Sequence, residues 1–238
     1  MPWLKWIEDE ALRIEVSKLL KFAQKAKYTA ETKFGKNVID PFAALFEISG
    51  FGINYDTWVI SETSRQAQKT LQNHVGEFHQ NILGYSKGWT NKMTGSVIDL
   101  ASEERKIIAE VKNKYSTISG GKLADLYISL DELVSPKASI YKGYLAYYVA
   151  IIPKKPERFD RPFTPSNKGK GAKCPLNVNI REIDGASFYD LVTGQRNSLE
   201  QLFNVLPDVI AKCSDSKMAV VDKRKLQIFF NSAYKLGS

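Results

Sequence analysis

The first half of the chain carries apolar residues at helical spacing. In residues 3–27 they recur every three or four positions, which predicts one amphipathic helix. Asp40-Pro41 is typical of a helix start, because the carboxylate can cap the first turn and proline lacks a donor that would stay unpaired there. A short apolar helix is therefore expected over residues 42–48, ending near Gly50. A longer helix is expected over residues 61–83.

The pattern changes to strands in the middle of the chain. Residues 96–101 and 107–115 are predicted strands, joined by the polar turn 102–106. Residues 144–152 are apolar and β-rich throughout, which is typical of a central strand. Residues 177–183 alternate as a fourth strand. Helices are expected at 123–133, from Asp184-Gly185 through Leu191, and at 199–212. This order predicts a mixed α/β sheet with flanking helices and additional N-terminal helices.

One domain is the expectation for this length. Domains commonly span roughly 100–200 residues, and the chain has 238. We expect a single unit over 1–238, with a mainly helical part at 1–92, an α/β core at 93–205 and further C-terminal elements at 206–238.

Composition excludes some classes of protein. No apolar run approaches the ~20 residues of a membrane span, and the first six residues do not resemble a secretory signal. Cys174 and Cys213 are far apart and have no metal-ligand spacing, which favours a reducing compartment and a cytoplasmic protein.

The chain is basic. Lysine and arginine number 34 against 26 acidic residues, for a formal net charge of +8 and a pI near 9.3. Such an excess favours a polyanionic partner, nucleic acid before a membrane surface. Many basic proteins bind no nucleic acid, so charge alone leaves the question open.

One arrangement of charged residues has the composition of a hydrolytic site. Glu110 and Lys112 lie two positions apart on a predicted strand and so point to the same face. The turn at 102–106 would bring Asp99 beside Glu110. Two carboxylates and an ammonium would then converge, as phosphodiester hydrolysis requires: hard oxygens bind Mg²⁺, and a lysine orients or deprotonates the attacking water.

Glu-x-Lys by itself is a weak motif, since the chain contains it three times. Glu31-Thr32-Lys33 has no nearby preceding aspartate, and Glu104-Arg105-Lys106 lies too close to Asp99 for a hairpin. Only Glu110-Val111-Lys112 combines a strand context with an aspartate at hairpin distance. The alternative is a surface hairpin with an ordinary cross-strand ion pair.

The arrangement resembles the PD-(D/E)xK nuclease superfamily, whose core is a mixed sheet with catalytic carboxylates on a central hairpin. Four segments more closely resemble type II restriction endonucleases that cut GGNCC or GGWCC sites, and the similarity spans about residues 74–205. Isoleucine precedes Asp99 where the superfamily name has proline, a position that varies widely. The four segments are residues 78–84 followed by Gly88-Trp89, 95–100, 108–114 and 184–191.

The resemblance implies a Mg²⁺-dependent cut of double-stranded DNA that leaves a 5′-phosphate. Asp99, Glu110 and the backbone carbonyl of Val111 are the expected metal ligands, and Lys112 is expected at the attacking water. Glu77 is a candidate auxiliary carboxylate, for which a solvated helix glutamate is the alternative. A homodimer is expected, because a two-fold pair of active sites most simply cuts both strands of a palindrome.

The basic loop 154–173 is the expected DNA-reading element. It has seven basic residues against two acidic ones, and arginines can contact guanine in the major groove. The alternative is a solvated loop that only attracts phosphate. Expected DNA contacts are Asn113, Lys114, Arg158, Arg161, Lys168, Lys170 and Lys173.

Two rival functions remain at this point. One is a repair or structure-specific nuclease with the same fold. The other is a non-catalytic DNA-binding module, in which the charges of the hairpin only pair with each other.

Overall fold

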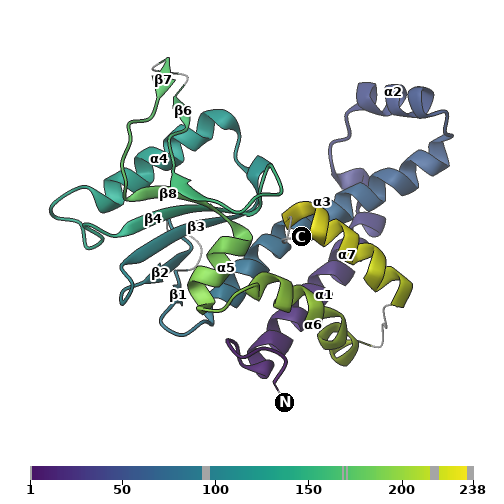
Figure 1. Cartoon of the computed structure of the whole chain (residues 1–238). Helices are drawn as coiled ribbons and strands as arrows, with labels where there is room; N and C mark the ends of the chain where they lie inside the picture. Colours follow the sequence, from purple (N-terminus) through teal and green to yellow (C-terminus); the bar gives the residue numbers. More distant parts are fainter. Residues whose placement is uncertain (1, 93–96, 168, 170, 215–219, 235–238) are drawn as a thin grey trace.

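A six-stranded mixed sheet with helices on both faces forms the body of the protein (Figure 1). The computed structural model describes residues 2–92, 97–167, 169, 171–214 and 220–234. The three central strands are parallel to one another, and the remaining pairs are antiparallel. In spatial order the strands are β1 (Thr90–Asn91), β2 (Leu100–Ser102), β3 (Ile107–Lys114), β4 (Leu145–Ile152), β8 (Ile180–Asp184) and β5 (Asp160–Pro162).

Helices cover the two faces unequally. One face packs mainly against helices from the N- and C-terminal parts of the chain, and α4 (Gly120–Val134) covers the other. No helix in the described residues is long and apolar enough to cross a membrane. The other helices are α1 (Asp9–Thr32), α2 (Pro41–Phe51), α3 (Tyr55–Gly84), α5 (Gly185–Thr193), α6 (Ser198–Cys213) and α7 (Val220–Tyr234), with short 3-10 turns η1 (Phe34–Lys36) and η2 (Tyr115–Thr117).

The mixed α/β prediction is confirmed, and several boundaries move. The first helix begins at Asp9 rather than near residue 3, where the Trp3 N–H donates to the Asp9 carboxylate at 2.8 Å. α2 begins as predicted, with the Asp40 carboxylate accepting from the Phe42 and Ala43 N–H groups. α3 begins six residues earlier than predicted, because the Asn54 side chain caps it.

The strand predictions were right in position and too long at two places. β3 and β4 lie where the sequence placed them, and β4 is central, between β3 and β8. The strand expected over 96–101 is Leu100–Ser102, and residues 93–96 lie outside the described part of the chain. The strand expected over 177–183 begins at Ile180. α7 was not predicted as a helix.

The basic stretch expected as a loop contains short strands. β5 joins the main sheet beside β8, and β6 (Ser166–Asn167) pairs with β7 (Ala172–Lys173) in a separate two-stranded ribbon. Phe163, within this stretch, is buried against the α4 side of the sheet.

Strand alternation decides on which face the charged residues lie. Ala109 and Val111 of β3 face the core that includes α1, α3, α5 and α6. Ile108 faces the core under α4. Glu110 and Lys112 share the parity of Ile108, so they lie on the α4 side of the sheet.

α1 and α3 pack side by side and extend beyond the sheet. Along the sheet, α3 runs opposite to β3: the Cβ that Gly84 lacks would meet Asn91, and that of Gly76 would lie 3.6 Å from the Asn113 Cβ. The 21 residues of α3 before Gly76 therefore continue about 30 Å past the carboxyl end of β3. We call residues 22–37 and 61–75 the stalk and residues 38–60, which include α2, the tip (Figure 1).

Candidate active site

Asp99 is held at the open end of the β2–β3 hairpin by two backbone–backbone hydrogen bonds and one from a backbone N–H to its side chain. Its N–H donates to the Ala109 carbonyl at 2.9 Å, and its carbonyl accepts from the Lys92 N–H at 2.8 Å. Its carboxylate Oδ2 accepts from the Val111 N–H at 2.7 Å. The hairpin that the sequence predicted thus brings the Asp99 side chain against the strand that carries Glu110.

Glu110 meets both of its predicted neighbours. The Lys112 ammonium is in direct contact with Glu110 Oε1. Burial and, after it, the nearby Asp99 carboxylate raise the pKa of Glu110 to about 7, although Lys112 opposes both effects. A second carboxylate can raise the pKa of Glu110 only if it is close. Asp99, Glu110 and Lys112 therefore converge and bring two carboxyl groups and one ammonium group together.

Gln80 of α3 reaches the same hairpin from behind. Its side-chain amide donates to the Val111 carbonyl oxygen at 3.2 Å. Gln80 follows Gly76 by one helical turn, and these two residues form the side of α3 that faces β3. The sequence reasoning missed Gln80, although it lies in a segment that carried the family resemblance.

These donors fit a hard divalent cation. Two carboxylates and a peptide carbonyl are the oxygen ligands that Mg²⁺ prefers. Two neighbouring carboxylates with one lysine leave a net negative charge in a buried setting, and burial followed by the Asp99 charge raises the pKa of Glu110. A cation between the carboxylates would relieve this charge. In the described part of the chain no group of three or more His, Cys, Asp or Glu side chains could hold a metal. A third protein ligand here would have to come from the backbone.

Comparison with known proteins gives the family. The sequence profile described as Eco47II restriction endonuclease matches residues 4–214. The chain belongs to the Eco47II restriction endonuclease family. It is 54% identical to the type II restriction enzyme Eco47II of Escherichia coli, over 98% of this chain and 100% of that protein. It is 29% identical to the type II restriction enzyme Sau96I of Staphylococcus aureus, over 91% of this chain and 83% of that protein. The predicted class, a type II restriction endonuclease, is confirmed.

Two of the segments that carried the resemblance to restriction endonucleases brace the fold of this family member. His79 of α3 is partly buried, and its Nδ1 lies 2.7 Å from the Tyr189 hydroxyl of α5. Burial lowers the pKa of His79 to about 4, so the ring is neutral. In the other segment, a Cβ on Gly185 would overlap the Ile151 carbonyl, so only glycine lets α5 begin this close to β4. Neither segment brings a further ionised side chain to the site.

Glu77 of α3 forms an ion pair with Lys18 of α1. Its Oε1 accepts from the Lys18 ammonium at 2.9 Å, and its Oε2 lies 3.3 Å from His74 Nδ1. Lys18, followed by His74, lowers the pKa of Glu77. Glu77 is one residue past Gly76, which turns its side chain from β3 toward α1. This placement favours the structural alternative for Glu77.

The two residues after Lys112 point in opposite directions. Asn113 faces α3, and its buried side-chain oxygen has no hydrogen-bond partner among the described residues. Lys114, two positions after Lys112, shares the face of Glu110 and Lys112. Of the two expected DNA contacts on this strand, Lys114 is thus the one on the side of the site.

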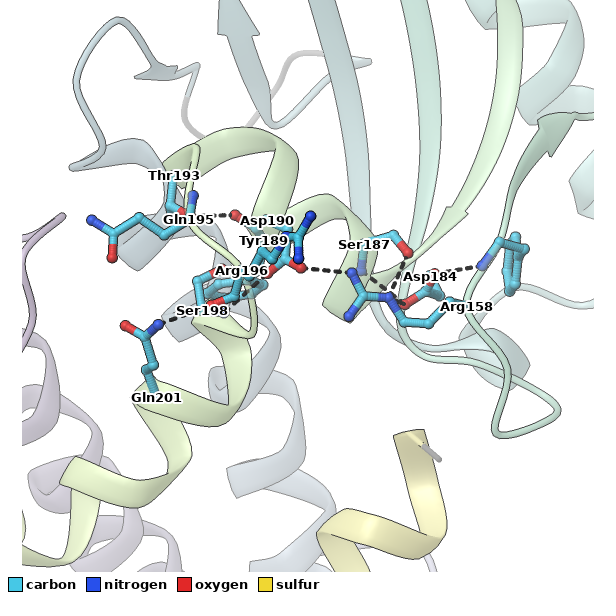
Figure 2. Close-up of polar contacts among 11 residues, drawn as sticks. Arg158, Asp184, Ser187, Tyr189, Asp190, Thr193, Gln195, Arg196, Ser198 and Gln201 are labelled. Carbon is cyan, nitrogen blue, oxygen red and sulfur yellow. Dashed lines mark hydrogen bonds and ion pairs between the residues drawn. The ribbon is translucent and has the colours of Figure 1, made fainter. Parts of the chain in front are cut away.

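Arg158 is tied to the N-terminal end of α5 (Figure 2). Its guanidinium donates to the Ser187 hydroxyl at 2.8 Å and to the Asp190 carboxylate at 2.7 Å, and it lies 3.8 Å from Asp184. The Asp184 carboxylate also accepts from the Phe159 and Ser187 N–H groups. These contacts fasten the beginning of the basic stretch to the body.

The other expected DNA contacts in the basic stretch differ in their placement. Arg161 donates to Glu182 at 2.7 Å and lies 4.5 Å from the centre of the Phe159 ring. Lys173 is exposed on β7. Lys168 and Lys170 lie outside the described residues.

Proposed function

We propose that this member of the Eco47II family cuts double-stranded DNA at a short palindromic GC-rich site of the GGNCC type. The reaction depends on Mg²⁺ and leaves 5′-phosphates. One observation carries the proposal: Asp99, Glu110 and Lys112 meet at the β2–β3 hairpin, with two carboxylates and one ammonium in a largely buried setting. The target type rests on the resemblance in the four sequence segments. The two relatives, both named type II restriction enzymes, support the enzyme class.

Asp99, Glu110 and the Val111 carbonyl would hold the metal. Bound Mg²⁺ supplies neutralisation of the scissile phosphate and acidification of a water molecule. The Val111 N–H fixes one oxygen of Asp99 and so orients that carboxylate. The Lys112 ammonium, which contacts Glu110, would orient the attacking water and stabilise the negative charge that develops on the phosphate oxygens.

Gln80 is a positioning residue in this scheme. A peptide carbonyl has two lone pairs, so the bond from Gln80 leaves Val111 able to accept a second partner. The bond fixes the peptide plane on which that second lone pair lies. Gln80 thus links the direction of the Val111 carbonyl to the position of α3.

The DNA is expected to approach the α4 side of the sheet, near the carboxyl end of β3. Lys114 and Lys173 are proposed phosphate contacts, together with Lys168 and Lys170. Asn113, Arg158 and Arg161 would have to leave their present surroundings to contact DNA. We also propose that residues 1–238 fold as one nuclease domain and act as a homodimer, with one active site for each strand.

Cleavage of a plasmid that contains GGNCC sites tests the proposal. With Mg²⁺, the wild type should give discrete fragments with 5′-phosphate ends, and EDTA should abolish them. Lys112→Ala should reduce the rate by about a thousandfold, since one electrostatic contact in the transition state is worth this much. Lys87→Ala is the matched control, because Lys87 is exposed beyond the opposite end of α3 and should leave the rate unchanged.

Other outcomes would identify the rival functions. Cleavage confined to branched or damaged DNA would indicate a structure-specific nuclease. Tight DNA binding without cutting in any divalent metal would indicate a binding module. An active Lys112→Ala variant would contradict the assignment of the site.

A further inference from the structure

The tip exposes large apolar side chains far from the core. No residue of α2 is buried, although the helix is almost entirely apolar. Seven large apolar residues of the tip are more than 60% exposed, which is unusual for so short a segment of a soluble domain. They are Val38, Phe42, Leu45, Phe46, Phe51, Tyr55 and Ile60.

The tip has a defined structure of its own. The Trp58 indole N–H donates to the Glu47 carboxylate at 2.8 Å, which fastens α2 to α3, and Trp58 is only 5% exposed. The opposite side of α2 carries Phe42, Leu45 and Phe46, spaced as i, i+3 and i+4. This spacing makes a single apolar face that points away from α3.

The charge of the tip distinguishes it from the stalk. Residues 38–60 contain no lysine, arginine or histidine and three acidic residues, whereas the stalk has six lysines and arginines against two glutamates. A surface without basic residues has no attraction for DNA phosphates or for an anionic membrane. The occupant of the tip is therefore a largely apolar protein surface.

The exposed area matches that of a dimer interface. Large apolar side chains have roughly 150–200 Å² of surface each, so two-thirds exposure of these seven gives about 800 Å². Stable interfaces bury about 800 Å² per partner. A second tip offers the same area and the same chemistry, as a two-fold symmetric contact requires.

The position of the tip is compatible with a joint action on DNA. The stalk extends on the side of the molecule where β3 ends, so the tip projects past the edge that carries Lys112 and Lys114. In a dimer whose stalks run side by side along the two-fold axis, both edges would face the same space, with the basic stalks beside it.

From these observations we infer that the tip is the interface through which two copies of this chain form the dimer. The inference rests on the proposed function in one respect, namely that a dimer cuts both strands. The surface itself is argued only from exposure, charge and area.

Sedimentation velocity of the full chain tests this interface. The wild type should be a dimer at micromolar concentration. Phe46→Glu and Leu45→Glu should each raise the dimer dissociation constant by at least about 30-fold, because a buried charge would replace an apolar contact. Ile140→Glu is the control, since Ile140 is 81% exposed on the body, between α4 and β4. It should leave the dimer intact, and all variants should keep the wild-type circular dichroism.

Cleavage of a plasmid with a single target site provides a second readout. Wild type and Ile140→Glu should linearise it, whereas the tip variants should slow linearisation at least tenfold and accumulate the nicked circle. A wild type that stays monomeric with and without target DNA would overturn the inference. A Phe46→Glu protein that dimerises like the wild type would also overturn it, and a loss of DNA affinity in that dimer would indicate that the tip contacts DNA instead.

The two proposals fail separately. If tip variants become monomeric while the wild-type dimer cuts no DNA, the interface stands and the cleavage proposal is wrong. If the wild type cuts DNA and dimerises regardless of the tip variants, the cleavage proposal stands and the interface lies elsewhere.

Discussion

Two acidic residues on parallel strands, β3 and β8 on either side of β4, have very different surroundings. Asp184, at the end of β8, is 1% exposed and accepts from two backbone N–H groups, with Arg158 nearby. Glu110, on β3, faces a second carboxylate, and burial together with Asp99 raises its pKa to about 7. Asp184, which has several hydrogen-bond donors, caps α5 and fastens a loop. Glu110, which is buried beside a second carboxylate, belongs to the candidate site, and strongly shifted pKa values are typical of functional sites.

The difference between Asp184 and Glu110 shows that an acidic residue in a family-like segment need not be catalytic. Residues 184–191 resemble restriction endonucleases as clearly as the Glu110 segment does. Figure 2 shows their acidic groups bonded within the segment and to Arg158 and Ser198. Asp190 accepts from both Arg158 and Ser198, so it joins the basic stretch to α6. In this segment the acidic side chains serve the fold.

The largest expected effect is a loss of activity when the carboxylate pair Asp99 and Glu110 is changed. Asp99→Asn keeps the oxygen that accepts from the Val111 N–H but loses the charge needed for Mg²⁺. The cleavage rate should fall by at least about a thousandfold, or about 4 kcal/mol of transition-state stabilisation. Plasmid cleavage measures it, and the exposed Glu103→Gln in the hairpin turn is the control. A rate within tenfold of the wild type would remove Asp99 from the site.

The next largest effect is a loss of stability when the hydrogen-bonded Asp184 is replaced. Asp184→Ala removes a buried acceptor and leaves the Phe159 and Ser187 N–H groups without it. The free energy of unfolding should fall by about 3 kcal/mol, measured by urea denaturation. Cleavage per folded molecule should stay within about twofold. A variant of unchanged stability that fails to cut would reverse the roles assigned to Asp184 and Glu110.

Glu110→Gln should stabilise the metal-free protein, and more at high pH than at low pH. Because the folded pKa of Glu110 is raised to about 7, the folded state binds more protons than the unfolded state between about pH 4.5 and 7. Glu110 therefore lowers stability as the pH rises through that window.

At pH 8 the gain should be about 3 kcal/mol, and it should shrink to near zero at pH 4. Denaturation with EDTA at both pH values measures it. Equal effects at both values would mean that Glu110 is not destabilised as a carboxylate.

The smallest effect concerns Arg158, where a structural role competes with a role in DNA binding. Its side chain is 35% exposed, so Arg158→Ala should cost only about 1 kcal/mol of unfolding free energy. DNA affinity should change less than twofold, by fluorescence anisotropy with a target duplex and Ca²⁺. Lys173→Ala is the comparison, with a reduced salt dependence of binding. A large loss of affinity in Arg158→Ala would restore its predicted DNA contact.

The predictable parts of the fold are those with a local cause. The Asp40-Pro41 helix start and the apolar β4 strand follow from capping chemistry and from periodicity within a few residues. The early start of α3 also has a local cause, the Asn54 cap, which the sequence prediction overlooked. Other missed features depend on distant partners: whether Arg158 is available to DNA depends on its contacts with Asp184, Ser187 and Asp190.

The sequence alone determined the hairpin and the trio on it. Turn length and the two-residue alternation of strands bring Asp99, Glu110 and Lys112 together, because both are properties of a short stretch of backbone. Only the tertiary structure decided that Gln80 bonds to Val111 and that Glu77 turns toward Lys18. It alone also decided that the tip stays uncovered. These features arise from the packing of segments dozens of residues apart, which no local pattern encodes.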